Sequence, residues 1–199
     1  MKRPHNPRAR SREWAALAAL LCAGSLLAVW IPAPWLDWQP AQAQAQPWRA
    51  LTAVFVHWSP QHLGTNLLAA AVVGAYGWAA GLPRRATLAW CVAWPLTHLG
   101  LWVQPALAHY GGLSGVLHAG VAIVTLWLLW AGRGWRQAIG AMVFSGLVIK
   151  LWTEQPWGPP LRHTAEWDIA VAPLAHATGA LAGLLCGAVA LAWPQKGAK

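Results

Sequence analysis

Six stretches of mainly apolar residues alternate with short polar segments along this chain. Five of them contain no acidic or basic residue, and the fifth in order contains only Lys150, near its end. A helix rises ~1.5 Å per residue, so ~18 to 20 residues cross ~30 Å of hydrocarbon. The pattern predicts an all-α membrane protein with six transmembrane helices, of which the fifth is the shortest. The stretches are 14–31, 63–82, 86–103, 113–131, 137–152 and 169–193.

Composition also indicates a membrane protein. Hydrophobic residues make up 57% of the chain and charged residues only 10%, whereas about 25% of a soluble domain is charged. A length of 199 residues suits one compact domain. We therefore predict a single membrane domain over 1–199, with a basic cytoplasmic tail at 1–12 and a core at about 48–193. The first stretch is long for a signal peptide and lacks a small-residue cleavage site, so we expect it to be retained.

The net charge of +9 would suit a nucleic-acid binder, but its distribution indicates membrane topology instead. With a cytoplasmic N-terminus and six spans, only Arg49, Lys150 and Arg162 lie outside. This asymmetry matches the positive-inside rule. It predicts that both termini are cytoplasmic and that nucleic acid is no partner. The eleven remaining basic residues, all inside, are Lys2, Arg3, Arg8, Arg10, Arg12, Arg84, Arg85, Arg133, Arg136, Lys196 and Lys199.

Polar side chains at membrane depth are costly, so each is a candidate for function. Ser59 and Pro60 predict a helix N-cap and first residue, which puts His62 in the first turn. Asn66 follows four residues later on the same helix face. Taken alone, the pair His62 and Asn66 is equally explained by a hydrogen bond that holds helices together.

Ser114 follows two glycines and opens the fourth stretch, where a helix N-terminus offers free backbone N–H groups. His176 closely follows Pro173, in the first turn of the sixth helix. A neighbouring histidine can activate a serine by taking its proton. We predict that Ser114 is a nucleophile and His176 its base, and that the Ser114 N–H, His62 and Asn66 stabilise the oxyanion. Taken alone, Ser114 is also explained by the small residues common in membrane helices, and His176 by a bond to a backbone carbonyl.

Glycines repeat every four residues on the face of the sixth helix that carries His176. This small-xxx-small pattern permits close helix packing. We expect it to seat the fourth helix within hydrogen-bond reach of His176. The glycines are Gly179, Gly183 and Gly187.

These motifs together resemble the rhomboid family. Its HxxxxHxxxN pattern, WR element, GxSG and AHxxGxxxG all occur here, in the same order, between about 48 and 185. The residues that carry the resemblance are Trp48, Arg49, His57, His62, Asn66, Gly112, Leu113, Ser114, Gly115, Ala175, His176, Gly179 and Gly183.

The resemblance implies a Ser/His dyad without a required aspartate, a water-filled cavity that opens outward, and hydrolysis of a peptide bond in or near a substrate's transmembrane segment. It implies no metal or organic cofactor. The expected partners are the lipid bilayer and a membrane-protein substrate with a transmembrane tail. The expected location is a bacterial inner membrane, with the site open to the periplasmic or external side.

The short length and the run Gly112-Leu-Ser-Gly-Val-Leu-His118 resemble one bacterial subgroup, the rhombosortases. Their implied substrates are exported proteins that end in a Gly-Gly motif, an apolar helix and a basic tail. The alternative is a general rhomboid protease with other membrane substrates.

His118 stands where many rhomboids have an aromatic residue one turn after the nucleophile. We expect it either to stack on His176 or to donate a hydrogen bond that orients it; its use as the base is a weaker alternative. Asp168 is a further, weak candidate for orienting His176. We interpret His98, His109 and His163 as interfacial or loop residues.

Three other classes of protein compete with this interpretation. A metalloprotease is disfavoured because the chain has no HExxH motif and no intramembrane Glu to act as base. A non-enzymatic haem or transport protein would use His62, His98, His118 and His176. A catalytically dead binding protein is disfavoured because Ser114 and His176 are both present.

The loop 153–172 precedes His176 and carries Trp157 and Trp167. A substrate in lipid must reach a buried serine, so this loop is a candidate lid. The alternative is an ordered external loop with tryptophans anchored at the interface.

Overall fold

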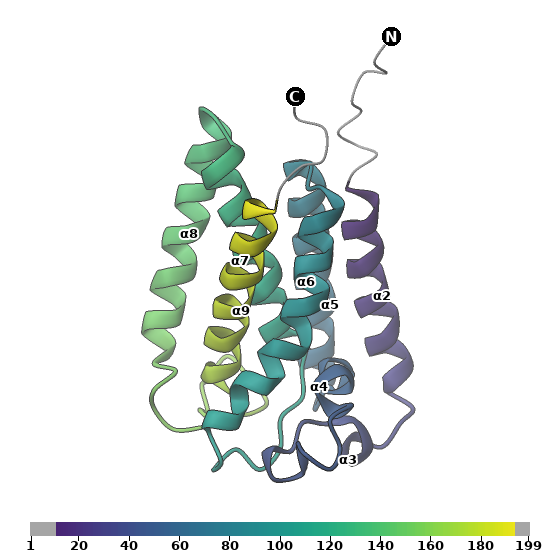
Figure 1. Ribbon diagram of the computed structural model, residues 1–199. Coiled ribbons are helices and arrows are strands. Elements are labelled where there is room, and N and C mark those ends of the chain that lie inside the picture. The colour runs from purple at the N-terminus through teal and green to yellow at the C-terminus, as the bar shows by residue number, and fades with distance from the viewer. Residues whose placement is uncertain (1–10, 194–199) are drawn as a thin grey trace.

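The computed structural model describes residues 11–193, and within this part six long helices lie side by side (Figure 1). Four short helices lie in the connection between the first two long helices: α3 (Ala33–Leu36), η1 (Pro40–Gln42), α4 (Arg49–Thr52) and η2 (Ala53–Phe55). A further short helix, η3 (Gly100–Val103), extends the third long helix, α6. No strand occurs among these residues, only two isolated bridges. The all-helical prediction is confirmed. The long helices are α2 (Arg12–Ala28), α5 (Pro60–Ala80), α6 (Arg84–Leu99), α7 (Ser114–Ala131), α8 (Trp135–Glu154) and α9 (Pro173–Ala192).

Four helical segments in the described part are long and apolar enough to cross a membrane. They are Pro60–Ala80, Arg84–Val103, Ser114–Ala131 and Pro173–Ala192. This finding confirms a multi-pass helical membrane protein.

The lengths of the helices correct one prediction. The fifth helix is not the shortest, since α8 has 20 residues and α2 has 17. The last helix begins at Pro173, as the prediction for His176 required, because proline at the first helical position needs no intrahelical N–H partner.

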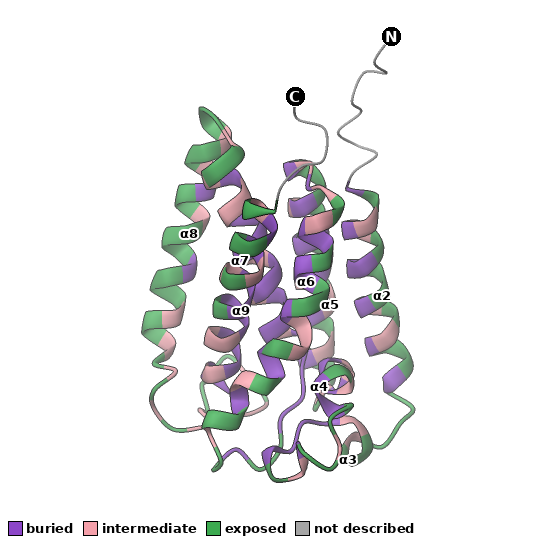
Figure 2. Cartoon of the chain, viewed as in Figure 1, coloured by how far each residue is buried: buried purple, intermediate pink, exposed green. Residues whose placement is uncertain are grey.

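The outward faces of the long helices carry large apolar side chains. Leu68 on α5, Leu88 on α6, Ile149 on α8 and Leu185 on α9 are each 60% or more exposed. Figure 2 shows exposed residues along the outer faces of the bundle, with buried ones turned inward. Exposed apolar surface on this scale is unusual for a soluble monomer. It matches helices that are surrounded by lipid.

Helix α7 runs through the middle of the bundle and packs against α5, α6, α8 and α9. Two fully buried tryptophans, Trp14 of α2 and Trp90 of α6, stack with ring centroids 4.2 Å apart. Trp90 donates its indole N–H to the carbonyl of Val116 on α7 at 2.8 Å, and Trp14 donates to Val73 on α5 at 3.0 Å. These bonds satisfy both polar tips inside an apolar core and join four helices.

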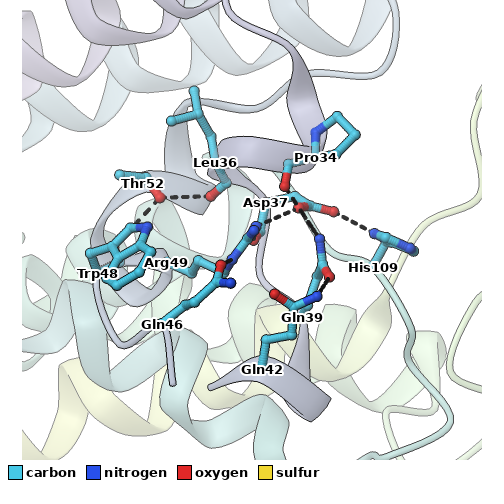
Figure 3. Close-up of polar contacts among 10 residues, drawn as sticks. All are labelled: Pro34, Leu36, Asp37, Gln39, Gln42, Gln46, Trp48, Arg49, Thr52 and His109. Carbon is cyan, nitrogen blue, oxygen red and sulfur yellow. Dashed lines mark hydrogen bonds and ion pairs between the residues drawn. The ribbon is translucent and has the colours of Figure 1, made fainter. Parts of the chain in front are cut away.

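A buried carboxylate organises the connection between α2 and α5 (Figure 3). Asp37 is fully buried and pairs with the Arg49 guanidinium at 2.9 Å. Gln39 donates to the same oxygen at 2.8 Å, and His109 Nδ1 lies 2.6 Å from the other. Next to it, Trp38 forms an antiparallel bridge with Tyr110. The cluster therefore fixes both this connection and the segment that leads into α7.

Asp37→Asn should destabilise the protein strongly, because Arg49 would stay buried without its counter-charge. Removing one partner of a buried pair costs roughly 3 kcal/mol or more. The matched control is Glu13→Gln, which removes a surface pair with the 80% exposed Arg84 side chain and should cost at most about 0.5 kcal/mol. Thermal unfolding in detergent measures both. Equal midpoints for the two variants would contradict the anchoring role of Asp37.

Candidate active site

Gly112, two residues before Ser114, has a backbone conformation that favours glycine and leads the chain into the start of α7. Gly112 has φ of +140°, a value that residues with a side chain rarely adopt. A Cβ atom there would also lie 3.0 Å from Cε1 and Nε2 of His62. The Gly112 N–H donates to the carbonyl of Ala53 at 3.0 Å. Ser114 is the first residue of α7, where backbone N–H groups have no intrahelical partner.

The structure brings Ser114 and His176 together. His176 lies in the first turn of α9, which begins at Pro173. Its Nε2 is 3.0 Å from Ser114 Oγ, within the range of a hydrogen bond. His176 is buried, with 6% of its surface exposed. A serine and a histidine in this arrangement have the geometry of an activated nucleophile.

Direct backbone contact between α7 and α9 sets this distance. A Cβ atom on Gly179 would overlap the carbonyl oxygen of Gly115, and one on Gly183 would come 2.7 Å from Cα of Ala119. A Cβ atom on Gly115 would lie 2.8 Å from the carbonyl oxygen of Ala175. Gly187 is looser, since the nearest atom to its Cβ would be a Leu126 methyl at 3.3 Å.

His62 and Asn66 lie on α5, buried, beside the same cavity as Ser114. Ser59 caps α5 by accepting the His62 N–H at 3.0 Å. The Trp58 N–H donates to His62 Nδ1 at 3.3 Å, so the proton of the neutral ring is on Nε2, next to Gly112. The Asn66 amide nitrogen is buried and has no partner in the described part of the chain. Both side chains therefore offer a free donor.

His57 packs against the ring of His62. Their ring centroids are 4.8 Å apart, and His57 Nδ1 lies 3.1 Å from the carbonyl oxygen of Phe55. Burial lowers the pKa of His57 to about 4, against a smaller opposing effect of the Phe55 bond. His57 is thus neutral at ordinary pH and adds no charge beside His62.

A cavity of about 90 Å³ opens onto Ser114 and His176. The loop between α8 and α9 forms much of its wall. Two bonds tie this loop to α5, from Ser59 Oγ to Asp168 at 2.8 Å and from the Gln61 amide to the Glu166 carbonyl at 2.9 Å. The lining residues are Trp58, His62, Asn66, His109, Tyr110, Gly111, Ser114, Lys150, Glu154, Leu161, Trp167, Ile169, Ala170, Val171, Ala172 and His176.

His118 stacks on His176, with ring centroids 4.3 Å apart and planes inclined by 16°. Its Nδ1 lies 2.7 Å from the carbonyl oxygen of Ser114, so the Nδ1–H donates there. Of the two arrangements expected for His118, the structure therefore shows the stack and not a bond to His176.

The structure rejects one weak alternative and one interpretation of a polar residue. Asp168 does not reach His176, because its carboxylate binds the Ser59 hydroxyl instead. His98 is neither interfacial nor in a loop. It is fully buried on α6, where Nδ1 lies 2.7 Å from the carbonyl oxygen of Ala50. His109 is in a loop as expected and binds Asp37, and His163 is exposed.

Sequence reasoning missed Glu154, the last residue of α8. One of its carboxylate oxygens, Oε2, lies 2.7 Å from His176 Nδ1, and the Lys150 ammonium binds the other. The pairing with Lys150 at i,i+4 was visible in the sequence, but the contact with a histidine across the α8–α9 loop was not. Within residues 11–193, no group of three or more His, Cys, Asp or Glu side chains is arranged to hold a metal ion.

The fold and site thus define a multi-pass helical membrane protein with a buried, hydrogen-bonded serine and histidine. Residues 44–193, well over half of the chain, match the family model described as the Rhomboid domain. The chain belongs to the rhomboid family, whose domain is that of intramembrane serine proteases acting on membrane proteins within the bilayer. No curated protein matches the chain.

Gly179→Ala should separate α9 from α7 and lengthen the contact between Ser114 and His176. A misplacement of about 1 Å can cost roughly 10²-fold in rate, so reaction of Ser114 with a soluble fluorophosphonate should slow by about that factor. Gly187→Ala, on the same face but with room for a methyl group, should react at nearly the wild-type rate. Equal rates for the two variants would show that the glycine contact does not set the geometry.

Proposed function

We propose that this protein is a serine endopeptidase that cuts membrane proteins with Ser114 as nucleophile and His176 as general base and acid. The observation that carries the proposal is the 3.0 Å contact between His176 Nε2 and Ser114 Oγ at the wall of a cavity. His176 takes the hydroxyl proton while Oγ attacks the peptide carbonyl. The tetrahedral intermediate then expels the amine, which receives that proton from His176. Water hydrolyses the acyl-enzyme by the same two steps.

Three donors are available for the oxyanion in this proposal. They are the backbone N–H of Ser114, the Nε2–H of His62 and the amide of Asn66. The unpartnered amide nitrogen of Asn66 supports the assignment, as does the position of Ser114 at a helix N-terminus. His57, Gly112, Gly115, His118, Gly179 and Gly183 have supporting roles, because they shape or pack against these groups.

We propose six spans with both termini cytoplasmic, in one domain over 1–199 in a bacterial inner membrane. Of the basic tail at 1–12, residues 1–10 lie outside the described part, as do 194–199. Support comes from one end of the bundle, where Arg84 pairs with Glu13, Arg85 binds the Trp193 carbonyl and Arg136 binds the Ala80 carbonyl. The starts of α7 and α9 are at the opposite end (Figure 1), and their first turns carry Ser114 and His176. By the positive-inside rule, the site then opens to the periplasmic or external side.

The rhombosortase subgroup is our more specific proposal, with exported substrates that end in Gly-Gly, an apolar helix and a basic tail. It rests on the Gly112–His118 run, in which His118 stacks on the proposed base. A general rhomboid protease with other membrane substrates is the alternative.

We further propose that the predicted lid 153–172, apart from Thr153 and Glu154, which belong to α8, moves to admit substrate. It lines the cavity through Leu161, Trp167 and residues 169–172. Its bonds to the start of α5 come from the N-cap Ser59 and from Gln61 in the first turn, and both are exposed, so their loss costs little. A substrate segment in lipid reaches Ser114 only if such a wall yields.

Ser114→Ala and His176→Ala should each abolish cleavage of a membrane reporter, because one variant lacks the nucleophile and the other lacks its base. The reporter ends in Gly-Gly, an apolar helix and a basic tail, and purified enzyme in liposomes is assayed on a gel. Unfolding midpoints close to wild type would show that both variants are folded. Near-normal turnover by His176→Ala would disprove the dyad.

A second reporter in which Leu-Leu replaces Gly-Gly is the control for substrate class. Cleavage of the first reporter alone would support a rhombosortase. Cleavage of both at the same rate would favour the general rhomboid protease.

Asn66→Ala should lower kcat more than it changes KM, because the oxyanion exists only after attack has begun. Losing one such donor typically costs ~10² to 10³ in kcat. Steady-state kinetics on the membrane reporter separate the two constants. A raised KM with unchanged kcat would assign Asn66 to substrate binding instead.

A further inference from the structure

We infer that Glu154 positions His176 and extends the Ser114–His176 pair to a hydrogen-bonded Ser–His–Glu triad. The inference rests on the proposed function of that pair. The carboxylate oxygen Oε2 of Glu154 is 2.7 Å from His176 Nδ1, and His176 Nε2 is 3.0 Å from Ser114 Oγ. One line of contacts therefore connects the end of α8, the start of α9 and the start of α7.

The carboxylate selects the tautomer of His176 that a base needs. An ionised carboxylate only accepts hydrogen bonds, so His176 Nδ1 must carry the proton. A neutral imidazole has a single N–H, which leaves the lone pair of Nε2 directed at the Ser114 hydroxyl. When Nε2 then takes the hydroxyl proton, the resulting imidazolium lies beside a negative charge in a buried position. An acidic residue has both of these roles in other serine hydrolases.

The end of α8 holds Glu154 firmly in place. The Lys150 ammonium, one turn earlier, binds the second carboxylate oxygen, Oε1. The Arg162 guanidinium donates to the backbone carbonyl of Glu154 at 2.7 Å and so satisfies one of the carbonyls left free at a helix C-terminus. Both carboxylate oxygens thus have cationic or N–H partners, and the side chain is only 22% exposed.

No other acidic residue of the chain can replace Glu154 in this geometry. Asp168 binds Ser59, and Asp37 binds Arg49 and His109. Glu13 pairs with Arg84 at the far end of the bundle, and the Glu166 side chain is outside the cavity lining. His118 complements Glu154, since its stack restrains the plane of the His176 ring while the carboxylate restrains rotation within that plane.

The test is Glu154→Gln, which keeps the size of the side chain and removes its charge. Its amide N–H can donate to Nδ1 and stabilise the tautomer whose Nε2 is already protonated. In other serine hydrolases the loss of the acidic member costs roughly 10⁴-fold in kcat. We expect a fall of about 10² to 10⁴-fold here, with KM and the unfolding midpoint nearly unchanged. Fluorophosphonate labelling of Ser114 should slow in parallel.

Two further variants control the interpretation. Glu154→Asp keeps the charge one methylene further away and should retain more activity than Glu154→Gln. Glu166→Gln removes a carboxylate from the loop that follows α8 without touching His176 and should behave as wild type. A purely structural role for Glu154 predicts the reverse pattern, with lowered unfolding midpoints and an unchanged kcat per folded enzyme.

The inference is overturned if Glu154→Gln keeps a near-normal kcat, or if the Asp variant is no better than the Gln variant. Ser114→Ala and His176→Ala are assayed alongside. If both are inactive while Glu154→Gln is active, only the triad fails. If either of them turns over normally, the dyad fails and the triad with it.

Discussion

The contact between the backbones of α7 and α9 is the constraint on which the rest of the site depends. Inside lipid, apolar side chains gain little from associating with one another, so close packing of small residues has to hold helices together. Gly179 and Gly183 let α9 approach until it touches the carbonyl of Gly115 and the Cα of Ala119. The side chains at the same end of these two helices are then close enough to share a proton. This contact between the two helices is sufficient to bring Ser114 and His176 within hydrogen-bond distance.

The buried groups divide the bundle into two unlike halves. The stack of Trp14 on Trp90 and its apolar neighbours fill the half that carries the arginine-rich turns. Around Ser114, the buried polar side chains of His62, Asn66 and His176 lie beside a second apolar cluster that includes Trp38, Leu101 and Leu107. The first half gives rigidity, and the second adds polar side chains that face a cavity. Burial of polar groups there is sustained by specific bonds, of which Asp37 with Arg49 is the clearest.

Local chemistry explains which parts of the fold and site could be predicted from the sequence. Ser59 before Pro60, the glycines before Ser114, and Pro173 each mark a helix start, and the four-residue glycine spacing marks a packing face. These signals are contained within a few residues. The contact of Glu154 with His176 crosses a loop without periodicity, and the burial of His98 and Asp37 depends on segments far away in the chain. No local pattern specifies such contacts, which explains why the sequence did not single out Glu154 as the carboxylate beside His176.

The segments on either side of the cavity are attached in very different ways. The connection between α2 and α5 is held by a fully buried ion pair and by its bridge to Tyr110. The loop between α8 and α9 is attached to the start of α5 by hydrogen bonds that are open to solvent, those of Ser59 and Gln61. Local opening requires far less free energy where contacts are few and solvated. We therefore expect the unpaired amide hydrogens between 155 and 172 to exchange with solvent long before those around Asp37.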